Sequence, residues 1–321
     1  EGETPWNPEW MQAHPEFYDF LIQSRLTYPL QGGETDWWDT ADLDYDNDEL
    51  RTEMISAMRY WVEEFDVDGY RCDVAGMVPV EFWNRVRYEL DSIKPVFMLA
   101  EDEDNDDLLR EAFDMNYGWK LHHIMNEIAQ GKQNSNDIWD YFDWNDSKYP
   151  SNSYRMYFTS NHDENSWNGT VKESYGDADH TFMALNFTTP GMPLIYSGQE
   201  YDLNKRLRFF EKDSFPKIAG KTMELIQQLG ALKNNHKALA SGKKGGSFKM
   251  LQTTKNNQIY AFERGKDGDT LVMIANLSKD YAQFTMPLDG MYRRYQDYKT
   301  KRLSSTYQYD LKPWEFWILI K

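Results

Sequence analysis

The sequence predicts an α/β protein: a partial (β/α)8 TIM barrel with about strands 4 to 8, followed by an antiparallel β-sandwich domain. Helical periodicity and short apolar runs alternate about five times before residue 240, which is the pattern of parallel strands joined by right-handed crossovers. After a glycine- and lysine-rich break at 241–246, short alternating runs replace the helices, as in antiparallel sheets. We therefore expect a catalytic barrel domain over residues 1–240 and a β domain over residues 241–321.

The first predicted helix runs from Asp48 to about Phe65, where apolar residues recur at helical spacing. Asp48 and Glu49 suit the positive end of the helix dipole. A strand is predicted over 67–73, a second helix over 79–92 and a second strand over 95–100. The helix and strand patterns therefore alternate from the start.

The later elements continue this alternation. We expect strands over 112–116, 155–160 and 193–197, and helices over 121–129, 178–188 and 217–232. In the C-terminal part, alternating runs predict strands over 258–263, 270–277, 282–286 and 314–320, with turns at 267–268 and 289–290.

Composition narrows the choice of partners. A net charge of -18 argues against a nucleic acid or an anionic membrane surface, and leaves neutral ligands such as sugars. No apolar run approaches the length of about 20 residues needed for a membrane span. Cys72 is the single cysteine, so the chain cannot form an intrachain disulfide, and the redox state of its cellular compartment stays open. We expect Cys72 to pack in a buried strand. An extracytoplasmic location is favoured, and the start at Glu1 suggests a processed or partial product.

Three predicted strands lead into carboxylates, at Asp73, Glu101 and Asp163. A buried strand has no structural use for an acid at its C-terminal tip, whereas glycoside cleavage needs two or three acids at one bond. Arg71 lies on the same strand face as Asp73, where its charge keeps that carboxylate ionised and suited to nucleophilic attack. The apolar residues 97–99 are expected to raise the pKa of Glu101, as a general acid requires.

Four motifs, found in the right order, resemble those of the α-amylase family of retaining α-glucan hydrolases, glycoside hydrolase family 13. They are similar to the motifs of the fourth, fifth, seventh and eighth barrel strands: Gly69-Tyr70-Arg71-Cys72-Asp73-Val74-Ala75, Leu99-Ala100-Glu101, Phe158-Thr159-Ser160-Asn161-His162-Asp163 and Gly191-Met192-Pro193-Leu194-Ile195-Tyr196-Ser197-Gly198-Gln199-Glu200. The resemblance implies a retaining glycoside hydrolase that acts on α-1,4-linked glucans, such as starch and maltooligosaccharides, through a covalent glycosyl-enzyme intermediate.

The resemblance also implies a role for each candidate residue. Asp73 corresponds to the nucleophile, Glu101 to the general acid and then base, and Asp163 to the residue that distorts and stabilises the sugar. Arg71 and His162 correspond to residues that hold the nucleophile and the substrate hydroxyls. Trp167 follows Asp163 closely, and either lines an acceptor subsite or packs in the core or on the surface.

The sequence also departs from the family pattern. The family's first motif, on the third strand, should lie upstream of Trp6 and is not found, so we expect the first three barrel strands to be missing. We interpret the chain as a C-terminal part whose barrel is completed by an N-terminal segment or by a second copy, and which need not be active alone. Ala75-Gly76 replaces a lysine-histidine pair, which puts a substrate-binding lysine and a calcium-linked carbonyl in doubt.

No metal-binding residues and no certain cofactor are predicted; a structural calcium ion is an open alternative that the sequence does not support. The segment 42–47 followed by Glu53 imitates the spacing of a calcium loop but lacks glycine at its sixth position, and the family resemblance explains it. Two alternatives to hydrolysis stay open: a transglycosidase, and a non-catalytic glucan-binding or scaffold protein on the same fold. The intact triplet of acids weighs against the second.

Overall fold

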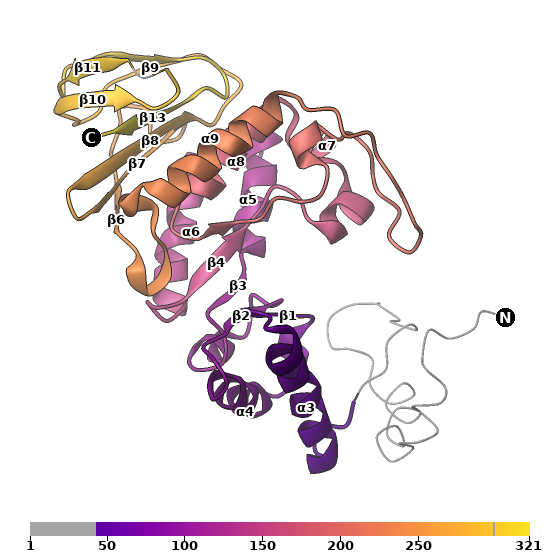
Figure 1. Ribbon diagram of the computed structural model, residues 1–321. Helices are drawn as coiled ribbons and strands as arrows, with labels where there is room; N and C mark the ends of the chain where they lie inside the picture. The colour runs from indigo at the N-terminus through magenta and orange to yellow at the C-terminus, as the bar shows by residue number, and fades with distance from the viewer. Residues whose placement is uncertain (1–42, 298) are drawn as a thin grey trace. The chain divides into compact units, whose positions relative to one another are not determined.

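The computed structural model describes residues 43–297 and 299–321 (Figure 1). The described residues form two compact units. The first contains the residues up to Ala100 and Glu111–Phe113, and the second contains Glu101–Arg110 and Asp114–Lys321. Trp6 and Asp42, on which two of the sequence-based expectations depend, lie outside the described residues. Among the described helices, none has the length and apolarity of a membrane span.

The first unit opens with helix α3 (Asp48–Phe65), whose bounds agree with the prediction. The helix begins here because the Asn47 side chain accepts hydrogen bonds from the backbone N–H groups of Glu49 and Leu50, at 2.8 and 3.2 Å. These bonds satisfy donors that have no partner within the helix. The segment whose spacing resembles a calcium loop therefore ends at Asn47 as the cap of a helix.

Two parallel strands follow in the same unit, β1 (Gly69–Cys72) and β2 (Phe97–Ala100). The turn η2 (Ala75–Met77) and helix α4 (Val80–Asp91) connect them. Gly69 permits the close pairing, because a Cβ at this position would lie 1.9 Å from the carbonyl oxygen of Phe97.

The second unit contains three further parallel strands. They are β3 (Met115–Tyr117), β4 (Tyr154–Tyr157) and β5 (Met192–Pro193), which pair in that order. The helices of this part are α5 (Trp119–Ala129), α6 (Ser135–Lys148), α7 (Val171–Tyr175), α8 (Asp179–Thr188) and α9 (Lys221–Asn235). Short helical turns occur at η3 (Asp106–Leu109), η4 (Glu164–Asn168), η5 (Gly176–Ala178), η6 (Gln199–Tyr201), η7 (Lys237–Leu239) and η8 (Gly242–Lys244).

Some boundaries differ from the prediction. The strand expected over 193–197 is much shorter, because the backbone N–H of Tyr196 donates to the side chain of Gln199, at 2.8 Å, and leaves the ladder. Helix α6 was not predicted at all. Its start is fixed by a capping box, in which Asn134 and Asp137 each accept a backbone hydrogen bond.

The C-terminal part is antiparallel, with the strand order β11-β10-β13-β8-β7-β6. The strands are β6 (Ser247–Met250), β7 (Ile259–Lys266), β8 (Asp269–Asn276), β10 (Gly290–Arg294), β11 (Thr300–Leu303) and β13 (Phe316–Ile320). A second sheet pairs β9 (Ala282–Phe284) with β12 (Tyr309–Leu311). The predicted turn at 289–290 instead leads directly into β10.

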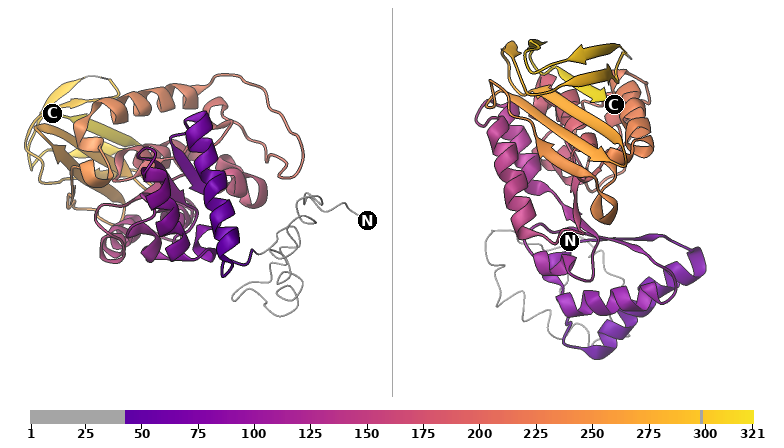
Figure 2. Two further views of the ribbon diagram at one scale, coloured as in Figure 1. Left: turned by 60° about the horizontal axis from the view of Figure 1, so that its bottom comes forward. Right: turned by 90° about the vertical axis from the view of Figure 1, so that its left-hand side faces the viewer.

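Both faces of the larger sheet are covered (Figure 2). On one face, Phe262 of β7 shares a core with Phe182 of α8 and Leu229 of α9. On the other face, Ile274 of β8 packs in a second core with Phe284 of the small sheet. The result is the two-layered β region that the sequence predicts, placed against the helices of the same unit.

Candidate active site

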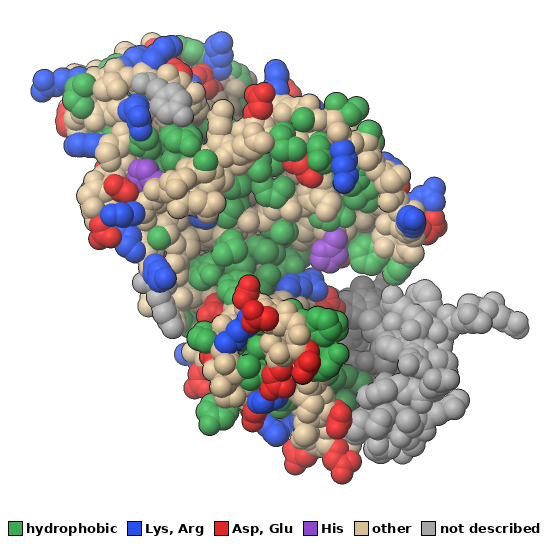
Figure 3. All heavy atoms as spheres, in the orientation of Figure 1, with side chains coloured by type: hydrophobic (Ala, Val, Ile, Leu, Met, Phe, Trp, Pro, Cys, Tyr) green, Lys and Arg blue, Asp and Glu red, His purple; other side chains and the backbone are tan. Residues whose placement is uncertain are grey.

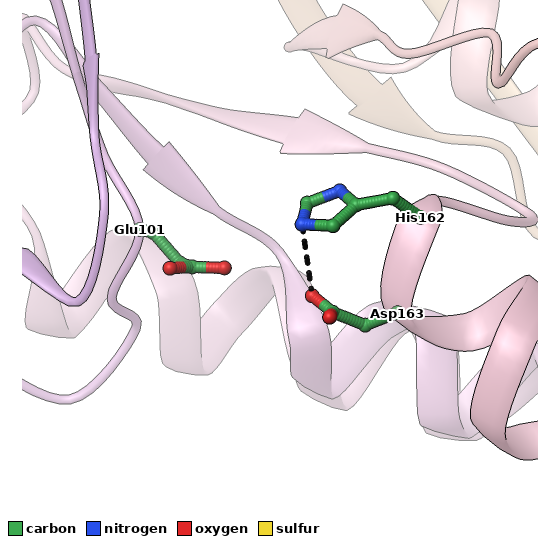
Figure 4. Close-up of side chains that lie close together, drawn as sticks. All are labelled: Glu101, His162 and Asp163. Atoms are coloured by element: carbon green, nitrogen blue, oxygen red, sulfur yellow. Dashed lines mark ion pairs between the residues drawn. The ribbon is translucent and has the colours of Figure 1, made fainter. Parts of the chain in front are cut away.

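Three predicted site residues come together in the second unit: Glu101, His162 and Asp163 (Figure 4). One side-chain donor atom of each lies within 4.8 Å of the others. His162 Nε2 lies 3.3 Å from Asp163 Oδ2, and the Glu101 carboxylate points toward this pair. Their side chains are partly exposed, with 45% of His162 and 33% of Asp163 accessible, so a ligand can reach them.

The turn that carries His162 and Asp163 is fixed by Asn161, which is fully buried. Its side-chain oxygen accepts hydrogen bonds from the backbone N–H groups of Asp163 and Glu164, at 3.0 and 2.8 Å. The chain then enters the wide π-helical turn η4, a feature often found at functional sites. Asn161 lies within a family-like motif, but no pattern in the sequence pointed to a role for it.

A buried polar network supports this turn from below. His122 Nε2 lies 3.0 Å from Glu164 Oε2, and His122 Nδ1 lies 3.2 Å from the carbonyl oxygen of Phe158. Burial would raise the pKa of Glu164, but the hydrogen bond and the charge of His122 outweigh it, so the pKa is lowered. Glu164 follows Asp163 directly, so the network constrains the backbone of Asp163.

Asp73 and Arg71 lie in the first unit and form an ion pair there. Asp73 follows the last residue of β1, so the shared strand face expected for the two side chains stays a prediction. Asp73 is largely exposed, with 73% of its side chain accessible. The next residue, Val74, has a left-handed backbone with φ 43°. This conformation is strained for a β-branched residue, by about 1–3 kcal/mol, and such strain tends to occur at functional sites.

The parallel register of β1 and β2 pairs the two residues that precede the candidate acids in the sequence. Cys72 of β1 pairs with Ala100 of β2 in a parallel ladder. The residue after Cys72 is Asp73, and the residue after Ala100 is Glu101. Cys72 itself is buried, and burial raises the pKa of its thiol to about 12, which fits a packing role.

Trp167 lies on η4, and 56% of its surface is exposed. Its ring contacts Phe209 and Phe210, with centroid distances of 5.1 and 6.0 Å. It therefore packs on the surface and is not part of the core. The two phenylalanines were not singled out in the sequence.

Glu103, two residues after Glu101, was not singled out in the sequence. Burial is the main reason that its pKa is raised to about 7. Glu103 accepts a hydrogen bond from the backbone N–H of Lys120, at 2.7 Å, in the first turn of α5. The dense run of acids after Glu101 was the available signal. The raised pKa expected for Glu101 itself stays a prediction.

A groove of about 1320 Å³ lies on the second unit, and His122 and Glu164 of the buried network are among its lining residues. Its lining includes Glu103, Trp119, His123, Glu127 and Trp144. Glu101, His162 and Asp163 are not among its lining residues. Bond cleavage requires groups that donate and accept protons or attack carbon, so the candidate active site is defined by Glu101, His162 and Asp163 and not by the groove.

The described residues contain one group of three side chains suited to hold a metal ion, namely Glu101, His162 and Asp163. They offer one nitrogen and two oxygen donors, a combination that binds divalent ions such as zinc. The same three side chains also fit acid–base chemistry on a sugar, and we assign no metal to them.

Parallel β/α units with acids placed just after strand ends define a class of enzyme in which the active site lies at the C-terminal face of the strands. Residues 34–236 match the family model for the alpha amylase catalytic domain, and the chain belongs to this family.

Two sequence relatives and one solved structure illustrate the likeness. The chain is 21% identical over 256 residues to an alpha-amylase, MalA, of Haloarcula japonica, and 25% identical over 263 residues to a cyclomaltodextrinase of Geobacillus thermopakistaniensis. These alignments cover 78% and 75% of this chain but only 37% and 42% of the relatives. The chain thus spans less than half the length of these relatives.

The structural match is broader. A noncanonic maltogenic alpha-amylase, AmyB, from Thermotoga neapolitana superimposes with a TM-score of 0.82 and 25% identity, over 97% of this chain and 73% of that one. The fold of an amylase with a partial barrel and a C-terminal β region is therefore confirmed.

Proposed function

We propose that the intact protein is a retaining glycoside hydrolase that cleaves α-1,4-linked glucans. The observation that carries this proposal is the aligned pair of strand ends: Cys72 faces Ala100, and a carboxylate follows each of them. The group of Glu101, His162 and Asp163 adds a third acid. The names of the relatives, alpha-amylase and cyclomaltodextrinase, support an α-glucan as the substrate class.

In the proposed first step, the Asp73 carboxylate attacks the anomeric carbon of a glucosyl residue. The bond from that carbon to the glycosidic oxygen breaks, and Glu101 transfers its proton to this oxygen, so the leaving chain departs as an alcohol. The product is a glycosyl ester on Asp73. Positive charge develops on the sugar during this step, and the Asp163 carboxylate stabilises it.

In the second step, Glu101 acts as a base. It takes a proton from water as the water oxygen attacks the anomeric carbon, and the bond to Asp73 breaks and restores its carboxylate. Each step inverts the configuration at the anomeric carbon, so the product has the same anomeric configuration as the substrate. A hydrolase of this kind needs its nucleophile and its acid about 5–5.5 Å apart.

The neighbouring side chains have supporting roles in this scheme. Arg71 holds the Asp73 carboxylate by their ion pair. His162, beside Asp163, donates a hydrogen bond to a sugar hydroxyl. Trp167 contributes an apolar surface next to the site, as its 56% exposure permits.

The test is release of reducing ends from a maltooligosaccharide by the intact protein and by Asp73→Asn and Glu101→Gln. We expect each variant to lose at least about 10³-fold in kcat, because each removes a group that reacts in the transition state. Asp177→Asn and Glu81→Gln are matched controls, since their side chains are 89% and 70% exposed.

Unchanged rates in Asp73→Asn or Glu101→Gln would remove the proposed roles. Product analysis separates the alternatives. Longer oligosaccharides among the products would indicate transglycosylation, and glucan binding without turnover by the wild-type protein would indicate the non-catalytic function.

A further inference from the structure

The loop between η6 and α9 is tied directly to the turn that carries Asp163. The Asn165 side chain donates to the carbonyl oxygen of Lys205, at 3.2 Å, and accepts from the backbone N–H of Leu207, at 2.8 Å. The Ser166 hydroxyl donates to the carbonyl oxygen of Leu207, at 2.8 Å. The loop backbone at 205–207 is thereby held by residues that lie two and three positions after Asp163.

Ion pairs brace the same loop on both sides. Arg206 Nε lies 3.0 Å from Glu173 Oε2 at the start of α7, and Lys205 pairs with Asp213 across the loop. Asp213 also accepts the backbone N–H of Arg208, at 3.1 Å. The segment is a long connection without helix or strand, yet its hydrogen bonds give it a defined position in the second unit.

This braced loop presents aromatic rings to solvent. Phe209 and Phe210 are 42% and 71% exposed, and Trp167 beside them is 56% exposed. The ring centroids of Phe209 and Phe210 lie 4.9 Å apart. In Figure 3 the loop, at the right of the second unit, shows charged side chains at its tip with apolar ones next to them. Exposed apolar patches rimmed by charges typically mark binding sites.

The patch is continuous with the candidate active site. The imidazole of His162 stacks on Phe209, with ring centroids 6.4 Å apart and planes inclined by 25°. A row of rings therefore extends from His162 across Phe209 to Trp167, and the plane of Trp167 is inclined by 45° to that of Phe209. Sugar rings have an apolar face that packs on such surfaces, and they carry no charge that the acids nearby would repel.

We propose that Phe209, together with Trp167 and Phe210, forms a stacking platform for a glucosyl residue next to the one held by His162 and Asp163. The proposal rests on the proposed function and adds a determinant of chain-length preference to it. The platform binds a residue of the same α-glucan chain, so only substrates long enough to reach it gain affinity from it.

The experiment compares kcat/KM of the intact protein for a maltooligosaccharide of five or more units with kcat/KM for a short aryl glucoside. We expect Phe209→Ala to lower the ratio of long-substrate to short-substrate kcat/KM about tenfold, mainly through KM of the long substrate. Phe209→Tyr keeps a flat ring and should restore most of the ratio. Tyr281→Ala, which removes an aromatic ring that is 55% exposed on the C-terminal region, should leave the ratio unchanged.

The outcomes separate this proposal from the proposed function. If the wild-type protein is active and Phe209→Ala has the same ratio of long-substrate to short-substrate kcat/KM, the platform alone is overturned. If the wild-type protein is inactive on both substrates, the function on which the platform rests is overturned. If Phe209→Ala unfolds, Phe209→Leu keeps the apolar volume without the flat face and gives the same test. Loss of self-association in a Phe209→Ala/Phe210→Ala variant, without a change in ratio, would instead identify a contact between copies and overturn the proposal.

Discussion

The two units hold their candidate acids by different means. In the first unit, strand register positions the backbone of Asp73, and the ion pair with Arg71 orients a side chain that is 73% exposed. In the second unit, the backbone of Asp163 is fixed from beneath by the buried side chains of Asn161 and His122. One acid depends on a surface ion pair and the other on a buried hydrogen-bond network.

This difference has an energetic consequence. A partly exposed ion pair contributes about 0–1 kcal/mol to stability, because water and salt screen it. Removing one partner of a buried hydrogen bond costs about 1–3 kcal/mol, because the remaining group is left without water. Variants of the second unit should therefore change both stability and activity, whereas variants around Asp73 should change activity with little effect on folding.

Among the residues that hold the candidate acids in place, the largest effect is expected for Asn161→Ala. The variant removes the acceptor for the N–H groups of Asp163 and Glu164, so kcat/KM should fall about 100-fold through misplacement of Asp163, and the free energy of unfolding should fall by about 1–3 kcal/mol. Kinetics and denaturant unfolding measure the two effects. Asn235→Ala, which removes an exposed amide on α9, is the control, and an equal effect of both variants would contradict the account.

A smaller effect is expected for Arg71→Gln. Loss of the ion pair with Asp73 should lower kcat/KM about 10- to 100-fold, while the melting temperature changes little. The matched variant is Arg110→Gln, which breaks exposed ion pairs to Asp106 and Asp107 and should be silent in both assays. A loss of stability in Arg71→Gln larger than that in Asn161→Ala would reverse the comparison between the units.

Glu103 provides a pH-dependent test in the second unit. Its folded pKa of about 7 lies above its ordinary value, mainly through burial, so the native state binds an extra proton between pH 4.5 and 7. The contribution of Glu103 to the free energy of unfolding is therefore fully present below pH 4.5, and it is lost as the pH rises through about 7. Glu103→Gln should remove this loss and raise the free energy of unfolding at pH 8 by about 1–2 kcal/mol.

The measurement is denaturant unfolding at pH 5 and pH 8. The free energy of unfolding should fall more from pH 5 to pH 8 in the wild-type protein than in Glu103→Gln. Glu224→Gln, on the exposed side of α9, should follow the wild type. If Glu103→Gln and wild type have the same pH dependence, Glu103 is not buried as described.

The smallest effect is expected for Val74→Gly. Glycine adopts the φ of 43° at this position without strain, so thermal stability should rise by the equivalent of about 0.5–1 kcal/mol. Activity should fall a few-fold, because the backbone next to Asp73 becomes less constrained. The control is Val80→Gly, in the first turn of α4, which should lower thermal stability. If Val74→Gly lowers thermal stability as well, Val74 is not strained.

The sequence predicted the elements whose periodicity is strong and local. Helix α3 was predicted with its bounds, and β1 and β2 lie within predicted strands. Elements fixed by single side chains were missed: α6 depends on the capping box of Asn134, and β5 is cut short by Gln199. Such bonds leave no periodic pattern, so a sequence can reveal them only through the identity of one residue.

The same distinction applies to the site. The sequence predicted that the acids Asp73, Glu101 and Asp163 act at one bond, and of these Glu101 and Asp163 lie close together, with His162, in the second unit. Each of them follows a strand-like run within a recognisable motif. The supporting residues Asn161, His122 and Glu164 were not assigned roles, because their importance comes from burial and from contacts between distant segments. Phe209 was missed for the same reason, since it lies 47 residues from His162 in the chain and only the folded loop brings the rings together.

Trapping the glycosyl-enzyme would show directly whether Asp73 is the nucleophile. The intact Glu101→Gln protein would be treated with a fluorinated maltosyl donor that carries an activated leaving group, digested and analysed by mass spectrometry. We expect a maltosyl adduct on the peptide that contains Asp73, and none when Asp73→Asn is added. An adduct on Asp163, or hydrolysis with inversion and no adduct, would contradict this role of Asp73.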